Sequence, residues 1–117
     1  MSHRRLVWYN PGMIDRRMLD RLIAVIISSV NPRKIILFGS MATGSQHDDS
    51  DVDLIVLIED GVTSTSEIAA RLYRETAGLL SAPLDILVER ENEFYARGEL
   101  PTMERRILRE GTVMYAA

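Results

Sequence analysis

The sequence is organised around residues 39–54, which read Gly-Ser-Met-Ala-Thr-Gly-Ser-Gln-His-Asp-Asp-Ser-Asp-Val-Asp-Leu. A glycine-serine turn, Gly39 and Ser40, precedes an Asp-x-Asp pair, Asp51 and Asp53. The pair opens an apolar run that continues to residue 58 and is typical of a buried strand. Residues two apart on a strand point to the same face, so we expect the two carboxylates to share one site.

Two carboxylates held this close together repel each other. At about 5 Å and an effective dielectric constant of about 20, two unit charges repel by roughly 3 kcal/mol. A divalent cation or a shared proton is needed to hold the carboxyl groups together. Magnesium fits best, because it prefers a few hard oxygen ligands and leaves room for water and phosphate. The pattern therefore predicts a metal-dependent phosphate site.

The composition narrows the class of protein and of metal site. The 117 residues include 46% apolar and 26% charged residues, which predicts one ordinary globular domain spanning residues 1–117. There is no cysteine, which excludes disulfides, thiolate metal sites and cysteine nucleophiles. Two histidines are too few for a histidine-built metal centre. Any metal must therefore bind to carboxylates.

Charge and hydropathy predict the surroundings of the protein. The net charge of -3 argues against binding of long nucleic acids, because such binding draws on clustered positive charge, but it is compatible with a small nucleotide. The longest apolar stretch, Leu22 to Ile27, is too short to span a bilayer. The N-terminus lacks the pattern of a signal peptide. We therefore expect a cytoplasmic protein without a membrane segment.

Periodicity and turn residues predict the order of elements after an irregular opening over residues 1–12. Helical spacing, β-branched runs and turn signals predict helices at 15–30, from 64 onward and at 102–110, and strands at 34–38, 51–58, 84–88 and 113–115. One or two helical turns before Gly44 would present backbone N–H groups to an anion. Residues 91–98 alternate charged and apolar residues and are assigned no element. Both faces of 51–58 are apolar beyond the carboxylates, which indicates a central strand.

A third carboxylate, Asp85, lies near the start of the predicted strand 84–88. A lone aspartate in an apolar strand must be paired, hydrogen-bonded or bound to a metal, because burying it unpaired is costly. Arg71 or Arg74 on the preceding helix is one possible partner, and a metal shared with the Asp-x-Asp pair is the other. Without the metal, Asp51 would begin the strand and Asp53 would pair with an arginine.

Taken together, these residues resemble the minimal nucleotidyltransferase domains of the DNA polymerase beta superfamily. The resemblance consists of the Gly39-Ser40 turn, the Asp51-Val52-Asp53 strand in a Ser-Asp-x-Asp-Leu context, and Asp85 after one intervening helix. The pattern and element order extend over roughly residues 20 to 115. The resemblance implies an α+β fold, a small mixed β-sheet with helices mainly on one face.

The family's mechanism implies a role for each matching residue. Asp51 and Asp53 would bind two Mg2+ ions, and Asp85 would complete one metal site and help activate the attacking hydroxyl. Gly39 and Ser40 would bind the triphosphate of ATP. Single-domain members commonly act as antitoxins beside a HEPN-type ribonuclease toxin, some by transferring AMP from ATP to a toxin tyrosine. The resemblance thus implies a protein adenylyltransferase and a possible hetero-oligomer.

The sequence departs from the family at two positions and leaves alternatives open. Many single-domain members have arginine where this chain has Met41 and Thr43. Their loss favours an antitoxin that neutralises its partner by binding alone. The chain lacks the extra domain by which polymerases and antibiotic-modifying relatives hold their acceptor, so we expect the acceptor to arrive as part of another protein. A free-standing transferase for a small hydroxylated molecule is a third alternative. Arginines elsewhere could replace the lost cations. The group at Arg105, Arg106 and Arg109 forms either a solvated helix face or a contact to a partner or phosphate.

Overall fold

Four strands form one mixed sheet in the computed structural model, which describes residues 16–39, 42 and 51–117. The strands are β1 (Lys34–Phe38), β2 (Val52–Ile58), β3 (Leu84–Arg90) and β4 (Thr112–Ala116), in the spatial order β3-β2-β1-β4. β1 pairs antiparallel with β2 and with β4, whereas β2 and β3 are parallel. The predicted central position of β2 and the short edge strand at the C-terminus are both confirmed.

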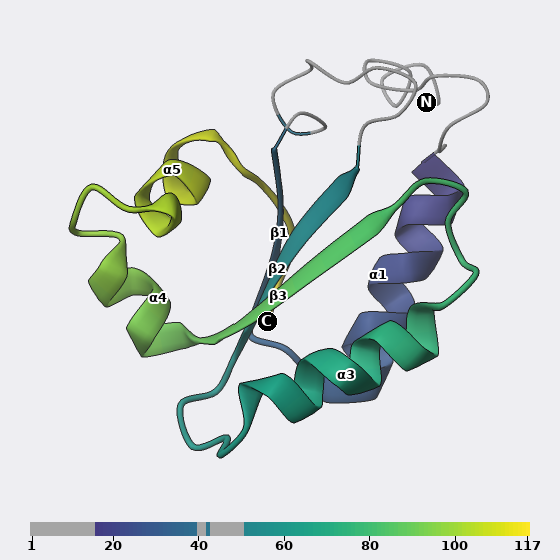
Figure 1. Cartoon of the computed structure of the whole chain (residues 1–117), viewed down its shortest axis with the longest axis horizontal. Coiled ribbons are helices and arrows are strands. Elements are labelled where there is room, and N and C mark those ends of the chain that lie inside the picture. Colours follow the sequence, from purple (N-terminus) through teal and green to yellow (C-terminus); the bar gives the residue numbers. More distant parts are fainter. Residues whose placement is uncertain (1–15, 40–41, 43–50) are drawn as a thin grey trace.

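Two longer helices cover one face of the sheet. They are α1 (Arg16–Val30) and α3 (Thr65–Thr76), which lie together on the right and lower side of the sheet in Figure 1. α1 buries four apolar residues at helical spacing, Leu19, Leu22, Ile23 and Ile26. These pack against Val52, Leu54, Val56 and Ile58, which point from β2 into the same core. The helix begins and ends close to the predicted residues.

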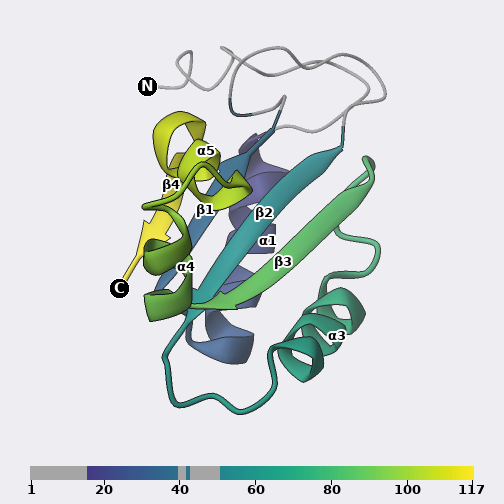
Figure 2. The same ribbon diagram turned by 60° about the vertical axis from the view of Figure 1, so that its left-hand side comes forward.

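The opposite face of the sheet carries a second, smaller core under two short helices. α4 (Glu91–Arg97) and α5 (Met103–Glu110) lie across the sheet from α1 and α3 (Figures 1 and 2). Phe94 of α4 and Ile107 of α5 pack here against Ile36, Ile55 and Leu57. The sheet is mixed, as predicted. The two longer helices lie on one face, in agreement with the expected arrangement, and the two short helices cover part of the other face. The alternation of the two faces of β2 follows the sequence.

α4 is the element that the sequence did not predict. It has only seven residues, and Phe94 is its one buried side chain. Arg90, the residue before its first turn, makes no capping hydrogen bond, but the backbone N–H of Asn92 donates to the Asp60 side chain, at Oδ1, over 2.9 Å. Helices this short are marginal on their own in water. α4 forms because Phe94 packs into the second core and a distant loop satisfies one of its backbone groups.

The other helix boundaries follow local rules. Ser64 accepts a hydrogen bond from the backbone N–H of Glu67 at 3.2 Å and so caps the beginning of α3. Thr102 likewise accepts from the N–H of Arg105 at 3.3 Å and precedes α5. Asn31, with a φ of 50°, ends α1, and its N–H donates to the carbonyl of Ile27. No helix in the described ranges is long and apolar enough to cross a lipid bilayer.

The carboxyl groups of Glu89 of β3 and Glu104 of α5 meet on the face of the sheet that α4 and α5 cover. Burial, followed by the hydrogen bond with Glu104 and the charge of Glu104, raises the pKa of Glu89 to about 7. The same hydrogen bond lowers the pKa of Glu104, a side chain that is only 4% exposed. Arg97 opposes the shift of Glu89 and Glu93 adds to it. Glu89 therefore keeps its proton and donates it to the Glu104 carboxylate.

This pair predicts a stability that falls with rising pH. The pKa of Glu89 in the folded state lies above its ordinary value. Between roughly pH 4.5 and 7, the folded state therefore keeps a proton that the unfolded chain has already released. Between pH 5 and 8 we expect the melting temperature to decrease. Glu89→Gln is expected to raise the melting temperature at pH 8 and to flatten its pH dependence, as measured by thermal unfolding followed by circular dichroism.

Glu99→Gln supplies the matched control, because Glu99 is an exposed carboxylate in the turn between α4 and α5. This variant is expected to keep the parent's pH dependence. A melting temperature for Glu89→Gln that still falls as steeply as the parent's would contradict the proton-sharing interpretation.

Candidate active site

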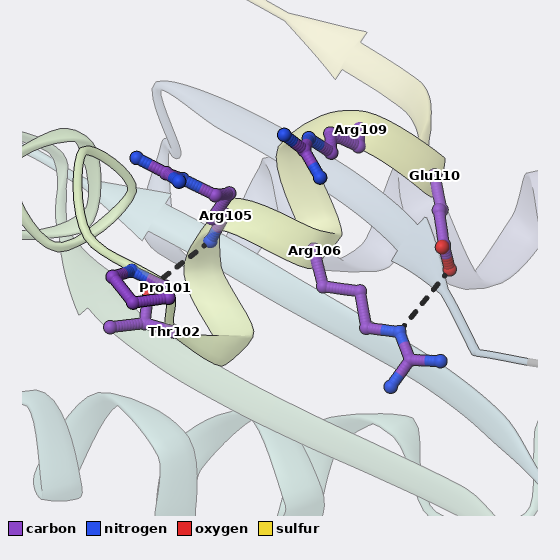
Figure 3. Close-up of a pocket in the computed structure, with 6 residues that line it drawn as sticks. All are labelled: Pro101, Thr102, Arg105, Arg106, Arg109 and Glu110. Atoms are coloured by element: carbon purple, nitrogen blue, oxygen red, sulfur yellow. Dashed lines mark hydrogen bonds and ion pairs between the residues drawn. The ribbon is translucent and has the colours of Figure 1, made fainter.

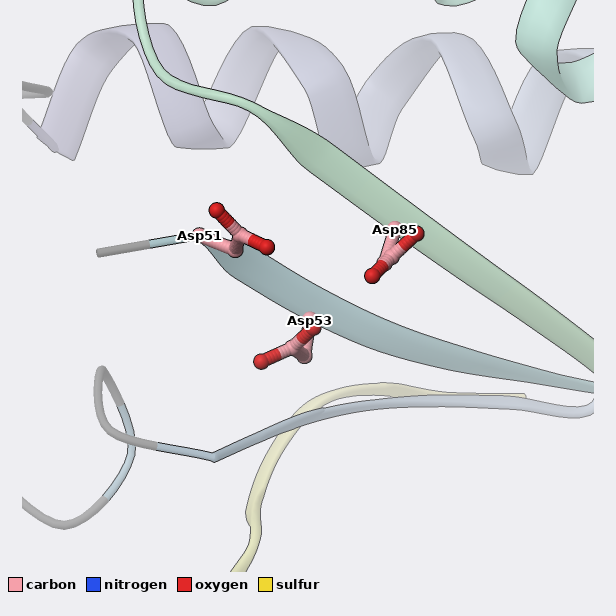
Figure 4. Close-up of side chains that lie close together, drawn as sticks. All are labelled: Asp51, Asp53 and Asp85. Atoms are coloured by element: carbon pink, nitrogen blue, oxygen red, sulfur yellow. The ribbon is translucent and has the colours of Figure 1, made fainter. Parts of the chain in front are cut away.

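Asp51, Asp53 and Asp85 meet at one end of the sheet. A carboxylate oxygen of each lies within 4.8 Å of the others, and Figure 4 shows them gathered where β2 and β3 begin. Asp53 is half-buried, whereas Asp51 and Asp85 are exposed. In the part of the chain that the structure describes, this is the one group of three or more such side chains arranged to hold a metal ion.

Strand pairing brings the three carboxylates together. In the parallel register of β2 and β3, Asp53 lies opposite Asp85. Asp51 directly precedes β2 and lies two residues from Asp53, so both point to the same side of the sheet. The N–H of Val52 donates to the carbonyl of Pro83 at 2.8 Å, which joins the beginnings of the two strands.

α3 also holds the strand that carries Asp85. The hydroxyl of Tyr73 accepts a hydrogen bond at 2.8 Å from the backbone N–H of Ile86, the residue after Asp85. Arg71, one of the two expected alternative partners of Asp85, pairs instead with Glu75 within α3 at 3.4 Å, and Asp85 is exposed. The position of Asp85 is thus set by strand pairing and by Tyr73, and its carboxylate is left facing the other two.

The electrostatics at Asp53 record the cost of this arrangement. Burial is the main cause that raises the pKa of Asp53, followed by the negative charges of Asp85 and Asp51. A bound cation would reverse both effects, since it supplies the opposite charge that the buried carboxylate lacks. Three hard oxygen donors in one place suit Mg2+ or a similar divalent ion. The residues therefore fit the metal that the sequence predicts.

Gly39 leaves room for the central carboxylate. It follows β1, whose last residue, Phe38, lies opposite Asp53 in the antiparallel register. The φ of Gly39 is 78°, and a side chain carbon added there would collide with Asp53 Oδ2. A glycine is therefore required by the backbone conformation and by the space that Asp53 occupies.

Part of the predicted nucleotide turn lies outside the described residues. Ser40, Met41 and Thr43 belong to that part, as do residues 1–12. Of the expected helical turn before Gly44, the structure describes Ala42, whose N–H donates to the carbonyl of Gly39 at 3.1 Å. The roles expected for Ser40 and for the positions of the lost arginines stay predictions.

Sequence reasoning did not anticipate two features around the site. One is Tyr73, whose hydroxyl is the group of α3 that holds β3. Its position thirteen residues before Ile86 carries no recognisable motif. The pairing of Glu89 with Glu104, further along the same face as Asp85, was also missed, because a glutamate in an arginine-rich helix looks like a solvent-exposed residue.

Comparison with known proteins identifies the family. The family model described as polymerase beta, nucleotidyltransferase matches residues 20–117. A solved structure described as a minimal nucleotidyltransferase is 32% identical, with a TM-score of 0.56 over 82% of this chain and 91% of that chain. No curated protein gives a significant match to the sequence.

More distant solved structures share the fold. A nucleotidyltransferase from Sulfolobus solfataricus is 16% identical, with a TM-score of 0.59 over 86% of this chain and 78% of its own. A toxin–antitoxin complex with AMP-PNP is 22% identical, with a TM-score of 0.53 over 84% of this chain and 73% of that chain. A structure of the toxin–antitoxin MntA–HpeT is also 22% identical, with a TM-score of 0.56 over 85% and 72%.

Removal of the central carboxylate is expected to separate stability from metal binding. Asp53→Asn relieves repulsion and burial of charge, so the metal-free variant should melt at the parent's temperature or above it. The parent should gain stability from Mg2+ or Mn2+, about 2.7 kcal/mol at a concentration 100 times Kd. The variant should lose this gain. Thermal unfolding with and without metal measures both effects.

Asp20→Asn is the control for this experiment, because Asp20 is an exposed aspartate on α1, a helix that covers the other face of the sheet. It should respond to the metal as the parent does. An equal metal-induced gain in Asp53→Asn would rule out the carboxylate site.

Substitution of Gly39 tests the close approach to Asp53. Gly39→Ala is expected to cost about 1–2 kcal/mol in the free energy of unfolding for the positive φ alone. It should also weaken the response to metal, because the added methyl group displaces the Asp53 carboxylate. Denaturant unfolding and metal titration measure the two effects.

Gly78→Ala separates the two contributions. Gly78 has a φ of 81° but no atom within 4 Å of an added side chain carbon. This variant should lose stability for the backbone strain and keep the full metal response. A normal metal response in Gly39→Ala would show that the glycine serves only the turn.

Proposed function

The chain belongs to the polymerase beta nucleotidyltransferase family, and from this we propose that it transfers AMP from ATP to a hydroxyl group of a partner protein. The observation that carries the proposal is the meeting of three carboxylates within 4.8 Å at the beginnings of β2 and β3. The partner we propose is a HEPN-type ribonuclease toxin, with a tyrosine as acceptor. The fold shared with two toxin–antitoxin complexes, one of them with AMP-PNP, supports this choice.

The proposed reaction is an in-line displacement at the α-phosphorus of ATP. The acceptor oxygen forms a bond to the α-phosphorus, and the bond from that phosphorus to the oxygen that bridges to the β-phosphate breaks. Pyrophosphate leaves with the electron pair of the broken bond. The hydroxyl proton passes to a carboxylate or to water. Most catalysis in such transfers comes from positioning and from neutralising charge.

The chain's own residues have distinct parts in this proposal. Asp51 and Asp53 would hold two Mg2+ ions, and Asp85 would share one of them. When bound, the ions neutralise charge on the phosphates and lower the pKa of the attacking hydroxyl. Asp85 is exposed at the edge strand of the sheet, where an acceptor hydroxyl can approach it from outside. Its carboxylate can orient that hydroxyl and accept its proton.

Gly39 and Ser40 are proposed to bind the triphosphate. Gly39 lies beside Asp53, so its backbone lies next to the carboxylate that would carry both metals. A glycine lets the phosphates approach the main chain closely, and a serine adds a hydroxyl donor. The site needs no lysine, unlike a P-loop.

A second candidate is an antitoxin that neutralises its partner by binding without transfer. Met41 and Thr43 favour it, because many single-domain members have arginine at these positions, where a cation faces phosphate. The two candidates differ in what the carboxylates do. In the binding-only candidate, removal of Asp53 leaves neutralisation intact.

The decisive experiment incubates the protein with ATP, Mg2+ and the product of the adjacent gene, followed by mass spectrometry of the partner. We expect adenylate on a tyrosine of the partner with the parent and with Asp20→Asn. We expect a loss of at least 100-fold in rate with Asp53→Asn, because the central metal ligand is gone. Transfer by Asp53→Asn at the parent's rate, or an unmodified partner that is still neutralised, would overturn the catalytic proposal.

A further inference from the structure

A triphosphate at the three carboxylates needs positive charge beyond the metal ions. We call the side of the sheet that carries Asp53, Ile55 and Leu57 the aspartate face. Asp51, Asp53 and Asp85 lie close enough to repel one another, and burial, followed by the charges of Asp85 and Asp51, raises the pKa of Asp53. Fixed cations aimed at phosphate oxygens are the usual device for binding them. The question is which arginine or lysine among the described residues can reach this place.

Most cations are on the wrong face or already bound. The arginines of α1 and α3 lie on helices that cover the opposite face, and Arg71 is an example, paired with Glu75 at 3.4 Å. At the far end of the aspartate face, Lys34 donates to the hydroxyl of Tyr95 at 2.7 Å. Arg90 donates to the carbonyls of Val62 and Thr63.

α5 is the cationic element at the level of the carboxylates. Leu37 of β1 lies opposite Leu54 of β2 on one side and Thr112 of β4 on the other. The last turn of α5 leads directly into Thr112, so it ends about two strand spacings, roughly 10 Å, across the sheet from the Asp53 level. Gly111 packs against Ile36 and the Leu37 carbonyl, which holds this end of the helix on the sheet.

The orientation of α5 selects Arg106. A side chain carbon added at Gly98, in the turn that joins α4 to α5, would collide with Leu108 Cδ1, so Leu108 marks the side of α5 toward α4. Arg106 is two residues earlier, about 200° around the helix, and points away from α4. α4 begins where β3 ends, at the opposite end of that strand from Asp85. The side of α5 away from α4 therefore faces the carboxylate end of the sheet.

Arg105, the neighbouring arginine on α5, is less suited to binding the phosphates. Arg105 donates to the backbone carbonyls of Gly98 and Glu99, which fixes its guanidinium at the beginning of the helix. Among the residues that the structure describes, Arg106 pairs with Glu110 alone, with Nε 3.4 Å from Oε1, and its side chain is 77% exposed. Figure 3 shows the side chains of Arg106 and Glu110 extending together from one side of α5. Exposed pairs of this kind are weak, so phosphate can displace Glu110.

We propose that Arg106 binds the β- and γ-phosphates of the nucleotide. Before the nucleotide binds, the Arg106 guanidinium is paired with the Glu110 carboxylate. Both lie along a shallow pocket of about 330 Å³ with Pro101, Thr102, Arg105 and Arg109. The inference rests on the proposed function, because it assigns a phosphate contact of that same site. It supplies the positive charge that Met41 and Thr43 do not.

Isothermal titration with ATP and Mg2+ tests the assignment without requiring turnover. Arg106→Ala is expected to weaken ATP binding about 10-fold to 100-fold, the range for loss of one charged hydrogen-bonding partner. Binding of AMP, which lacks the β- and γ-phosphates, should change little. Glu110→Gln should tighten ATP binding several-fold, because the competing carboxylate is gone.

Arg71→Ala is the matched control. Its arginine makes the same kind of pair, with a glutamate four residues later at 3.4 Å, on the helix that covers the opposite face. It should bind ATP as the parent does. Thermal unfolding of each variant verifies folding, and the exposed position of Arg106 predicts little loss of stability.

The outcomes separate this inference from the proposed function. If the parent binds ATP and Arg106→Ala binds it equally tightly, the inference is wrong and the proposed function stands. If Arg106→Ala weakens AMP and ATP binding to the same degree, the contact to the outer phosphates is wrong. If the parent binds no nucleotide at all, both fail together.

Discussion

The repulsion among three carboxylates is the constraint on which this structure depends. Parallel pairing of β2 and β3 sets Asp53 opposite Asp85, and β1 brings Gly39 beside the same carboxylate. The meeting of the carboxylates is unfavourable without a cation, because burial and the neighbouring charges oppose the ionised form of Asp53. The apolar faces of β2 supply the opposing stability. Val52, Leu54 and Val56 anchor one side of the strand, and Ile55 and Leu57 anchor the other.

The second core has a structural role and a functional one. Ile36, Ile55 and Leu57 pack with Phe94 and Ile107 on the aspartate face, so α4 and α5 occupy one part of it, and among the described residues no helix covers the carboxylate end. α5 is thereby fixed beside the site rather than over it. A helix placed in this way can contribute charge at the edge of the site while the acceptor retains access from the side of β3.

The sequence allowed much of this arrangement to be predicted, for identifiable physical reasons. Strands with two apolar faces and helices with a continuous apolar stripe follow from the spacing of residues such as Leu54 and Leu22. Glycine-serine and Asp-x-Asp spacing marked the site. The register of β3 could not be read in this way, because a slip of two residues keeps the same side chains on each face. α4 was missed because it depends on the packing of Phe94, a tertiary contact that leaves no local pattern.

The crossover from β2 through α3 to β3 also has a consequence for folding. Asp51 and Asp53 precede α3 in the chain, whereas Asp85 follows it, so Asp85 has no local contact with the other two carboxylates in an unfolded chain. Their meeting requires closure of a long loop, and such non-local pairing is a slow event in folding. A cation that binds all three would therefore bind only chains in which the crossover has closed. Binding of a cation at this site would then distinguish folded chains from chains in which β3 has not yet paired with β2.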